Sequence, residues 1–172
     1  MQSDLFAPTP EGEARLLLLI DAFSGPTKSL EGRTKLAKLD FLLRYPAYLQ
    51  RALVKRAPQA DWPASAETGG AIENRMIRYR YGPWDPAYFA LLGSLIGRVL
   101  IETIPGSNGL HFRTTQQGSL VVRMLASSES WRGIHEVTRL LRRHFDLSGN
   151  SLKRFVYETF PEVVGKPWGE EL

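Results

Sequence analysis

Side chains that commonly carry enzyme chemistry are few and widely spaced in this sequence of 172 residues. Cysteine is absent, which excludes disulfides, thiolate metal sites and cysteine nucleophiles. The three histidines, His111, His135 and His144, are far apart, and Glu136 beside His135 would point to a different face of a helix. We therefore expect no metal site and no bound cofactor.

Motifs of known catalytic or nucleotide-binding sites are also missing. The sequence lacks the phosphate loop GxxxxGKS/T, the dinucleotide-binding GxGxxG after a strand, the GxSxG nucleophile elbow and HExxH. Asp40 has basic neighbours on its own predicted helix, so we expect a surface ion pair there. Glu102 stands on a predicted strand whose alternation places it outward. The sequence favours a protein that is not an enzyme, since catalysis would require carboxylates that meet only in the folded chain.

Basic side chains give a stronger indication of function. The net charge is +4, and arginine, which favours planar contacts with phosphate or carboxylate, supplies most of the 22 basic residues. Clustered basic side chains are typical of surfaces that contact nucleic acid or an acidic partner. Three short stretches hold the candidates for such contacts: Arg33, Lys35, Lys38, Arg51, Lys55, Arg56, Arg75, Arg78 and Arg80. A solvated helix face is the alternative interpretation of the first two stretches.

Three helices are predicted in the first part of the chain, and two of them carry the first six basic candidates. Residues 11–23 have acidic side chains in their opening turn, where the helix dipole favours them. Residues 33–46 place leucines on one helical face, and Pro46 offsets a third helix over 47–56. These helices contain few Asn or Gln side chains, which disfavours base-specific DNA recognition. Residues 58–70, rich in Pro, Ser, Ala and Gly, are predicted to form a loop.

Residues 77–86, IRYRYGPWDP, are predicted to join a strand to a helix. Alternation places Arg78 and Arg80 together on one side of the strand, and the Gly-Pro pair turns the chain. Asp85 then caps the next helix, with a proline at its first position and Trp84 packed over its start. The outward face of this joint is the site where we expect the third group of basic candidates to meet an acidic partner or a DNA backbone.

The rest of the chain is predicted to contain an apolar helix, a β-hairpin and three further helices. The hairpin spans residues 99–115, and its turn carries no Arg or Lys. Thr114, with a Gln three positions later, is a capping-box pattern for the next helix, in which Gly118 permits close packing. Ser128 or Ser130 caps the helix after that. A helix that leads into a hairpin and then into a capped helix is typical of a winged helix.

The predicted fold is therefore mainly α, of the α+β class: a winged helix-turn-helix with a short β-hairpin wing and additional C-terminal helices. Residues 1–57 and 71–126 are expected to form one domain, joined by the loop 58–70. Residues 127–172 are expected to form a C-terminal helical extension with an acidic tail. No signal peptide or long apolar stretch is present, so we expect a cytoplasmic protein without membrane contact.

Three stretches together resemble a known family: EGRTKLAKLDFLLRYPAYLQRAL, YRYGPWDPAYFALLGSLIGRVLIE and FRTTQQGSLVVRML, within residues 30–126. The chain is similar to the small winged-helix middle component of bacterial ABC-three-component defence systems, which is allied to the small subunit of Lamassu systems. The resemblance implies a non-enzymatic accessory subunit. Such a subunit bridges an SMC-like or Rad50-like coiled-coil ATPase and an effector nuclease that acts on phage or plasmid DNA. Contact with double-stranded DNA would then occur through the complex.

The resemblance attaches no catalytic role to the positions that match its motifs: Arg33, Lys35, Lys38, Asp40, Arg44, Tyr45, Pro46, Tyr79, Tyr81, Gly82, Pro83, Trp84 and Asp85. Residues after 127 lie outside it. A partner interface there would use Trp131, Arg142 and Arg143, because aromatic and arginine side chains are common interface anchors. Core packing is the other interpretation of Trp131. The alternative function is a free-standing winged-helix DNA-binding transcriptional regulator, which the basic second and third helices favour.

Overall fold

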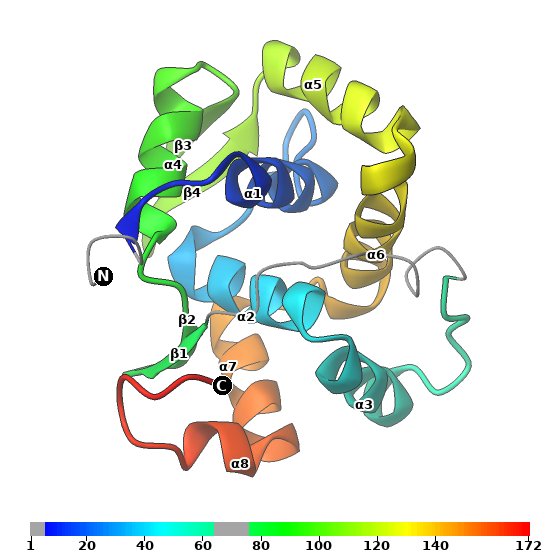
Figure 1. The fold of residues 1–172 in the computed structure, drawn as a ribbon, viewed down its shortest axis with the longest axis vertical. Coiled ribbons are helices and arrows are strands. Elements are labelled where there is room, and N and C mark those ends of the chain that lie inside the picture. The colour runs from blue at the N-terminus through cyan, green and yellow to red at the C-terminus, as the bar shows by residue number, and fades with distance from the viewer. Residues whose placement is uncertain (1–5, 64–75) are drawn as a thin grey trace.

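The structure is a computed structural model that describes residues 6–63 and 76–172. It is a mixed α+β fold, 59% helical, with two small antiparallel hairpins (Figure 1). In chain order the elements are α1 Pro10–Ala22, α2 Gly32–Arg44, α3 Pro46–Arg56, β1 Ile77–Tyr79, β2 Gly82–Trp84, α4 Tyr88–Gly97, β3 Ile101–Gly106, β4 Gly109–Thr114, α5 Gln116–Ser127, α6 Glu129–Phe145, α7 Gly149–Thr159 and α8 Pro161–Val164. The predicted α+β class is confirmed. Arg75 and most of the predicted loop 58–70 lie outside the described residues.

Helix α1 lies in the centre of the core beside α2. The Thr9 hydroxyl accepts the Gly12 amide hydrogen at 3.0 Å and Pro10 occupies the first turn, so the start of α1 is fixed by local residues. Its run Leu16–Ile20 is buried, because α2, α4, α5 and α6 all pack against α1. The prediction of a helix over 11–23 is confirmed.

Helix α2 is buried around its whole circumference, not only on its leucine face. Its charged side chains are buried as well: Lys35 is 2% exposed, Lys38 1% and Asp40 0%. The expectation of a solvated basic face with a surface ion pair at Asp40 is therefore wrong. Helices α6 and α7, which come from the end of the chain, pack on α2 together with α1, α3 and both hairpins (Figure 1).

Residues 77–84 form a hairpin, where a single strand followed by a turn was expected. Strands β1 and β2 pair antiparallel, and Arg80 and Tyr81 make the reversal between them. Gly82 follows with a φ of +104°, a backbone conformation that only glycine adopts readily. The Gly-Pro pair therefore lies in the second strand, and the predicted position of the turn is wrong by two residues.

The residues before the next helix only partly follow the prediction. The Asp85 carboxylate accepts the Ala87 amide hydrogen at 2.8 Å, but this bond lies in the turn before the helix. The N-cap of α4 is Ala87, which has no side-chain cap, so the prediction that Asp85 caps the helix is wrong. The ring of Trp84 packs edge-on against Tyr88, with 5.0 Å between the ring centroids. Regular helix α4 begins at Tyr88, two residues later than the predicted first position at Pro86.

The second hairpin pairs β3 with β4 along their whole length, as predicted. Thr115, one position after the predicted Thr114, caps α5 by accepting the Gly118 amide hydrogen at 3.0 Å. A side chain at Gly118 would lie only 2.0 Å from the Leu100 carbonyl oxygen, so the predicted close packing is confirmed. This hairpin also pairs with the segment before α2, where Leu30 exchanges two backbone hydrogen bonds with Phe112.

The helices after residue 127 share one hydrophobic core with α1 and α2. Ser128 caps α6 by accepting the Trp131 amide hydrogen at 3.3 Å. The last residues run back along β1, where the Arg78 amide donates to the Glu170 carbonyl at 2.8 Å. The segment predicted as an acidic tail is thus a third backbone partner of the first hairpin (Figure 1). Among the described residues, no helix has the length and apolar character needed to span a bilayer.

Candidate partner-binding surface

A closed network of ion pairs joins α1, α2 and the start of α4. Asp40 accepts hydrogen bonds from Arg15 Nε and from the Tyr88 hydroxyl, both at 2.8 Å. Asp85 accepts one from Arg44 Nη1 at 2.5 Å. The diagonal pairs, Arg15 with Asp85 and Arg44 with Asp40, approach within 3.6 and 3.5 Å. Two guanidinium groups therefore balance two carboxylates in the interior.

Charge balance keeps Asp40 ionised in this network. Burial by itself raises the pKa of the Asp40 carboxyl group, but the charges of Arg15 and Arg44 lower it, as do hydrogen bonds from Arg15 and Tyr88, so the net pKa is lowered. Burial and the Asp40 charge raise the pKa of the Tyr88 hydroxyl well above its ordinary value. The network is shielded from solvent and its charges are matched, so it stabilises the fold and is not available to a substrate.

Three predicted basic candidates hold α3 against the C-terminal helices. Arg51 pairs with Glu162 of α8. Arg56 Nε donates to a carbonyl at the end of α6 at 2.5 Å, and the Lys55 ammonium lies 5.8 Å from the centroid of an aromatic ring of α7. These side chains are exposed, but each already contacts a neighbouring helix.

The candidates on α2 and α6 are similarly engaged. The Lys35 ammonium bonds to the Asp146 carboxylate at 2.8 Å, and Arg142 pairs with the other oxygen of the same group at 2.8 Å. Trp131 is partly buried and packs against the core, which agrees with the core-packing interpretation of this residue. Arg143 is exposed. Lys35 is thus a buried structural residue and not a surface contact.

The remaining basic candidates differ in their exposure to solvent. Arg33 of the first group and Arg80 are exposed. Arg78 is only 8% exposed, since α8 and the C-terminal tail cover it, and its Nε donates to the Val164 carbonyl at 2.9 Å. The expectation that Arg78 and Arg80 share an outward face is therefore wrong for Arg78. Lys38 is buried near it.

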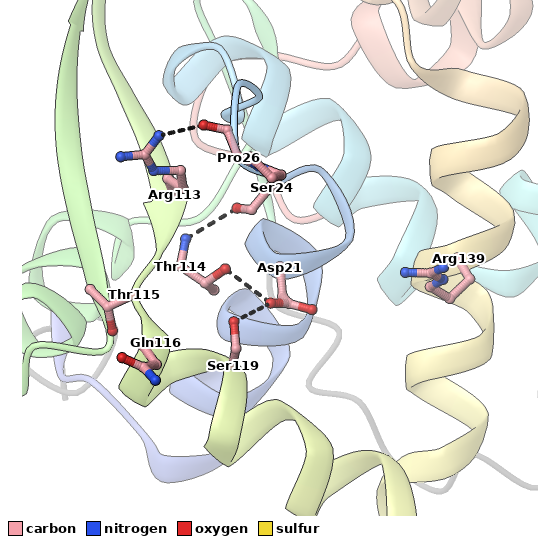
Figure 2. Close-up of a pocket in the computed structure, with 10 residues that line it drawn as sticks. Asp21, Ser24, Pro26, Arg113, Thr114, Thr115, Gln116, Ser119 and Arg139 are labelled. Atoms are coloured by element: carbon pink, nitrogen blue, oxygen red, sulfur yellow. Dashed lines mark hydrogen bonds between the residues drawn. The ribbon is translucent and has the colours of Figure 1, made fainter.

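A polar pocket of about 540 Å³ lies where α1, β4 and α5 meet (Figure 2). Asp21 Oδ1 accepts the hydroxyl hydrogens of Thr114 at 2.9 Å and Ser119 at 3.3 Å, and the Thr114 amide donates to Ser24 Oγ at 3.1 Å. Arg139 of α6 borders the opposite side (Figure 2). Because these polar groups bond mainly to one another, we interpret the pocket as a joint between three elements.

A larger groove of about 910 Å³ lies between α4, the tip of the β3–β4 hairpin and the first turns of α2 and α7. Its apolar side chains include Phe89, which is 62% exposed, and the exposed Ile96 and Leu110. The Arg33 guanidinium lies over the Phe89 ring, 4.6 Å from its centroid. An open groove that exposes several apolar side chains, with a cation at its edge, is suited to the apolar side chains of another protein.

Four aromatic side chains extend this groove across the first hairpin to the C-terminal tail. We call Phe89, Trp84, Tyr79 and Trp168 the aromatic row. Successive ring centroids along it are 6.2, 5.9 and 6.3 Å apart, and all members but the half-buried Trp84 are exposed. Contiguous exposed apolar side chains mark interaction sites, and Trp and Tyr are common anchors of interfaces. The groove and the aromatic row together form the candidate partner-binding surface.

Metal-ligating side chains do not gather in the part of the chain that the structure describes. Across residues 6–63 and 76–172, no group of three or more His, Asp or Glu side chains could hold a metal ion. His111 contacts the Ser29 hydroxyl at 3.3 Å. Burial and the charge of Arg139 lower the pKa of His135, which lies on α6.

Several residues of this surface were not among the sequence-based candidates, chiefly Phe89, Ile96, Leu110 and Trp168. One signal was available: α4 is apolar around its whole circumference, which is unusual for a helix that has one side at the surface. The groove itself was not predictable, because four segments far apart in the sequence assemble it.

A scan against protein-family models finds no match for this chain, and neither do comparisons with curated proteins and with solved structures.

Proposed function

We propose that the protein is a non-catalytic accessory subunit of an SMC-like ATPase complex in bacterial defence against phage or plasmid DNA. In this role it works in the cytoplasm, bridges the coiled-coil ATPase and an effector nuclease, and meets double-stranded DNA through the complex. The observation that carries the proposal is the aromatic row, which runs into the apolar groove. The sequence motif that supports the choice of partner, YRYGPWDPAYFALLG, supplies three of the four members of that row.

We further propose that the fold is a winged helix in which β3–β4 is the wing. The helix before the wing would then be α4, yet its exposed side chains include Phe89 and Ile96, which carry no hydrogen-bonding groups for base edges. The wing turn, Ser107–Asn108, holds no cation for a DNA backbone. These features favour a surface for protein over the alternative of a free-standing DNA-binding regulator.

The proposal is tested by co-expression of the chain with the products of its neighbouring genes, among which we expect a coiled-coil ATPase, followed by co-purification. We expect a stable complex at moderate salt. Phe89→Glu places a charge in the groove and should weaken binding by more than about thirtyfold, the effect of losing an interface anchor. Met124→Glu is the matched control, because Met124 is 71% exposed on α5, away from the groove.

Absence of a complex with the unmodified chain would refute the proposed partner. Equal loss of binding in the two variants would refute the proposed surface. Saturable, sequence-dependent binding of DNA by the isolated chain would favour the regulator instead.

A further inference from the structure

Three cationic side chains lie around the β1–β2 hairpin, one on β1 and two on the helices α2 and α7 that pack against β2. Lys38 of α2 lies against Gly82. A Cβ atom added at Gly82 would be 3.4 Å from the Lys38 ammonium nitrogen. Arg78 projects from β1, and Lys153 from α7, where its ammonium lies 4.9 Å from the centroid of the Tyr81 ring. The charges of Lys153 and Arg78 both act on Lys38. We call Lys38, Arg78 and Lys153 the cation cluster.

The cation cluster has no matching negative charge among the described residues. None of the ion pairs found in residues 6–63 and 76–172 includes Lys38, Arg78 or Lys153. Arg78 Nη1 is buried and has no hydrogen-bond partner there. Buried cations in proteins are normally paired, because an unpaired charge loses its hydration without compensation. Two buried cations without such a partner, Lys38 and Arg78, therefore call for an anion.

The surroundings of Lys38 disfavour its charged form. Burial, with the charges of Lys153 and Arg78, lowers the pKa of Lys38 from 10.5 to about 7. The groups that face it are Arg78 from the first hairpin and Lys153 and Tyr157 from α7. An anion bound among them would reverse this effect and favour the charged ammonium.

We propose that Lys38, Arg78 and Lys153 form a binding site for the phosphate group of a small molecule, beside the β1–β2 hairpin. Three cations with several unused N–H groups match a phosphate dianion better than a single carboxylate. The cluster reaches solvent on the α7 side, where Lys153 is partly exposed and Tyr81 is exposed. A duplex backbone is too wide to reach Lys38, which is 1% exposed. The site is separate from the candidate partner-binding surface and does not depend on the proposed function.

Inorganic phosphate is the probe for this site, and the readout is the melting temperature at constant ionic strength. Phosphate also stabilises proteins by exclusion from their surface, so the comparison is between variants of the full chain. For the unmodified chain and for Lys28→Met, which removes an exposed lysine elsewhere, we expect a rise of about 4 °C at about twenty times Kd. For Lys38→Met we expect this saturable rise to be lost.

Lys153→Gln provides a second variant that leaves the buried residues in place. We expect it to weaken the phosphate Kd by about tenfold, the effect of losing one charge-assisted hydrogen bond. The same melting response in all four proteins would overturn the proposal. A response to duplex DNA without any response to inorganic phosphate would overturn it as well.

Discussion

Helix α2 buries charged side chains on two sides, and the two sides differ in charge balance. On one side Asp40 and Arg44 join Arg15 and Asp85 in a network of two cations and two anions. On the other, the charged groups that act on Lys38 among the described residues are both cations, Arg78 and Lys153. Lys38 and Asp40 are two positions apart and equally buried. Burial of a charged side chain therefore does not by itself indicate a binding site. The indication at Lys38 is that its buried charge lacks a counter-charge among the described residues.

The largest expected effect comes from breaking the balanced network. Asp40→Ala leaves the guanidinium groups of Arg15 and Arg44 buried without one of their two carboxylates, and should cost about 3–5 kcal/mol of unfolding free energy. Urea denaturation followed by circular dichroism measures this cost. A loss below 1 kcal/mol would show that the network contributes little to the fold.

Lys38 should have the opposite effect on stability. Lys38→Met replaces an unpaired buried charge by an apolar side chain of similar size, so we expect stability at pH 7 to be unchanged or raised by about 1–4 kcal/mol. Thermal unfolding in phosphate-free buffer is the measurement. Destabilisation as large as that of Asp40→Ala would remove the distinction between the two sides of α2.

The same residue makes stability depend on pH. The pKa of Lys38 is about 7 in the folded chain and 10.5 ordinarily, so between these values the unfolded chain binds more protons. Unfolding free energy should therefore rise with pH in this window, by up to about 1.4 kcal/mol per pH unit, and Lys38 should add no slope below pH 7. Denaturation at several pH values should show this slope in the unmodified chain and a smaller one in Lys38→Met.

Gly82 should have a smaller effect, because it only shapes the hairpin over the cation cluster. Its φ of +104° is unfavourable for residues with a side chain, so Gly82→Ala should cost about 1 kcal/mol. Chemical denaturation measures this change. An Ala variant as stable as the unmodified chain would mean that the turn can relax without consequence.

The smallest effect is expected at the exposed ion pair of the second hairpin. Arg113 pairs with Glu102 at 2.7 Å on the surface, where solvent screens the charges. Glu102→Gln should change the unfolding free energy by less than about 0.5 kcal/mol. It is also the control for Asp40→Ala, since both variants remove one carboxylate from an Arg–carboxylate pair.

Helix starts were predictable from the sequence because local residues determine them. Ser128 and the proline at position 46 act within one turn of their own helices, and the structure places helix boundaries beside both of them. The β3–β4 hairpin was predictable for the same reason. The capping Thr115 differs from the predicted Thr114 by one position, as two adjacent threonines offer the same hydroxyl.

The candidate site was far less predictable, because contacts between distant segments decide which side chains are exposed. The charges of α2 suggest a solvated face, yet Lys35 and Lys38 face residues of the C-terminal part of the chain, Asp146 and Lys153. Asp40 is covered from α1 and α4, by Arg15 and Tyr88. Arg78 alternates with Arg80 as a surface strand would, but the C-terminal tail and α8 lie over it. For Lys35, Lys38 and Arg78, the covering residues follow more than 80 positions later in the chain.

The most direct test of the proposed role is hydrogen exchange of the chain alone and in complex with the coiled-coil ATPase. We expect binding to slow amide exchange in β1–β2, in α4 and at the tip of the β3–β4 hairpin, which carry most of the groove and of the aromatic row. Exchange in α3 and α5 should stay unchanged. Protection confined to α3 or α5, with none in α4, would contradict the account.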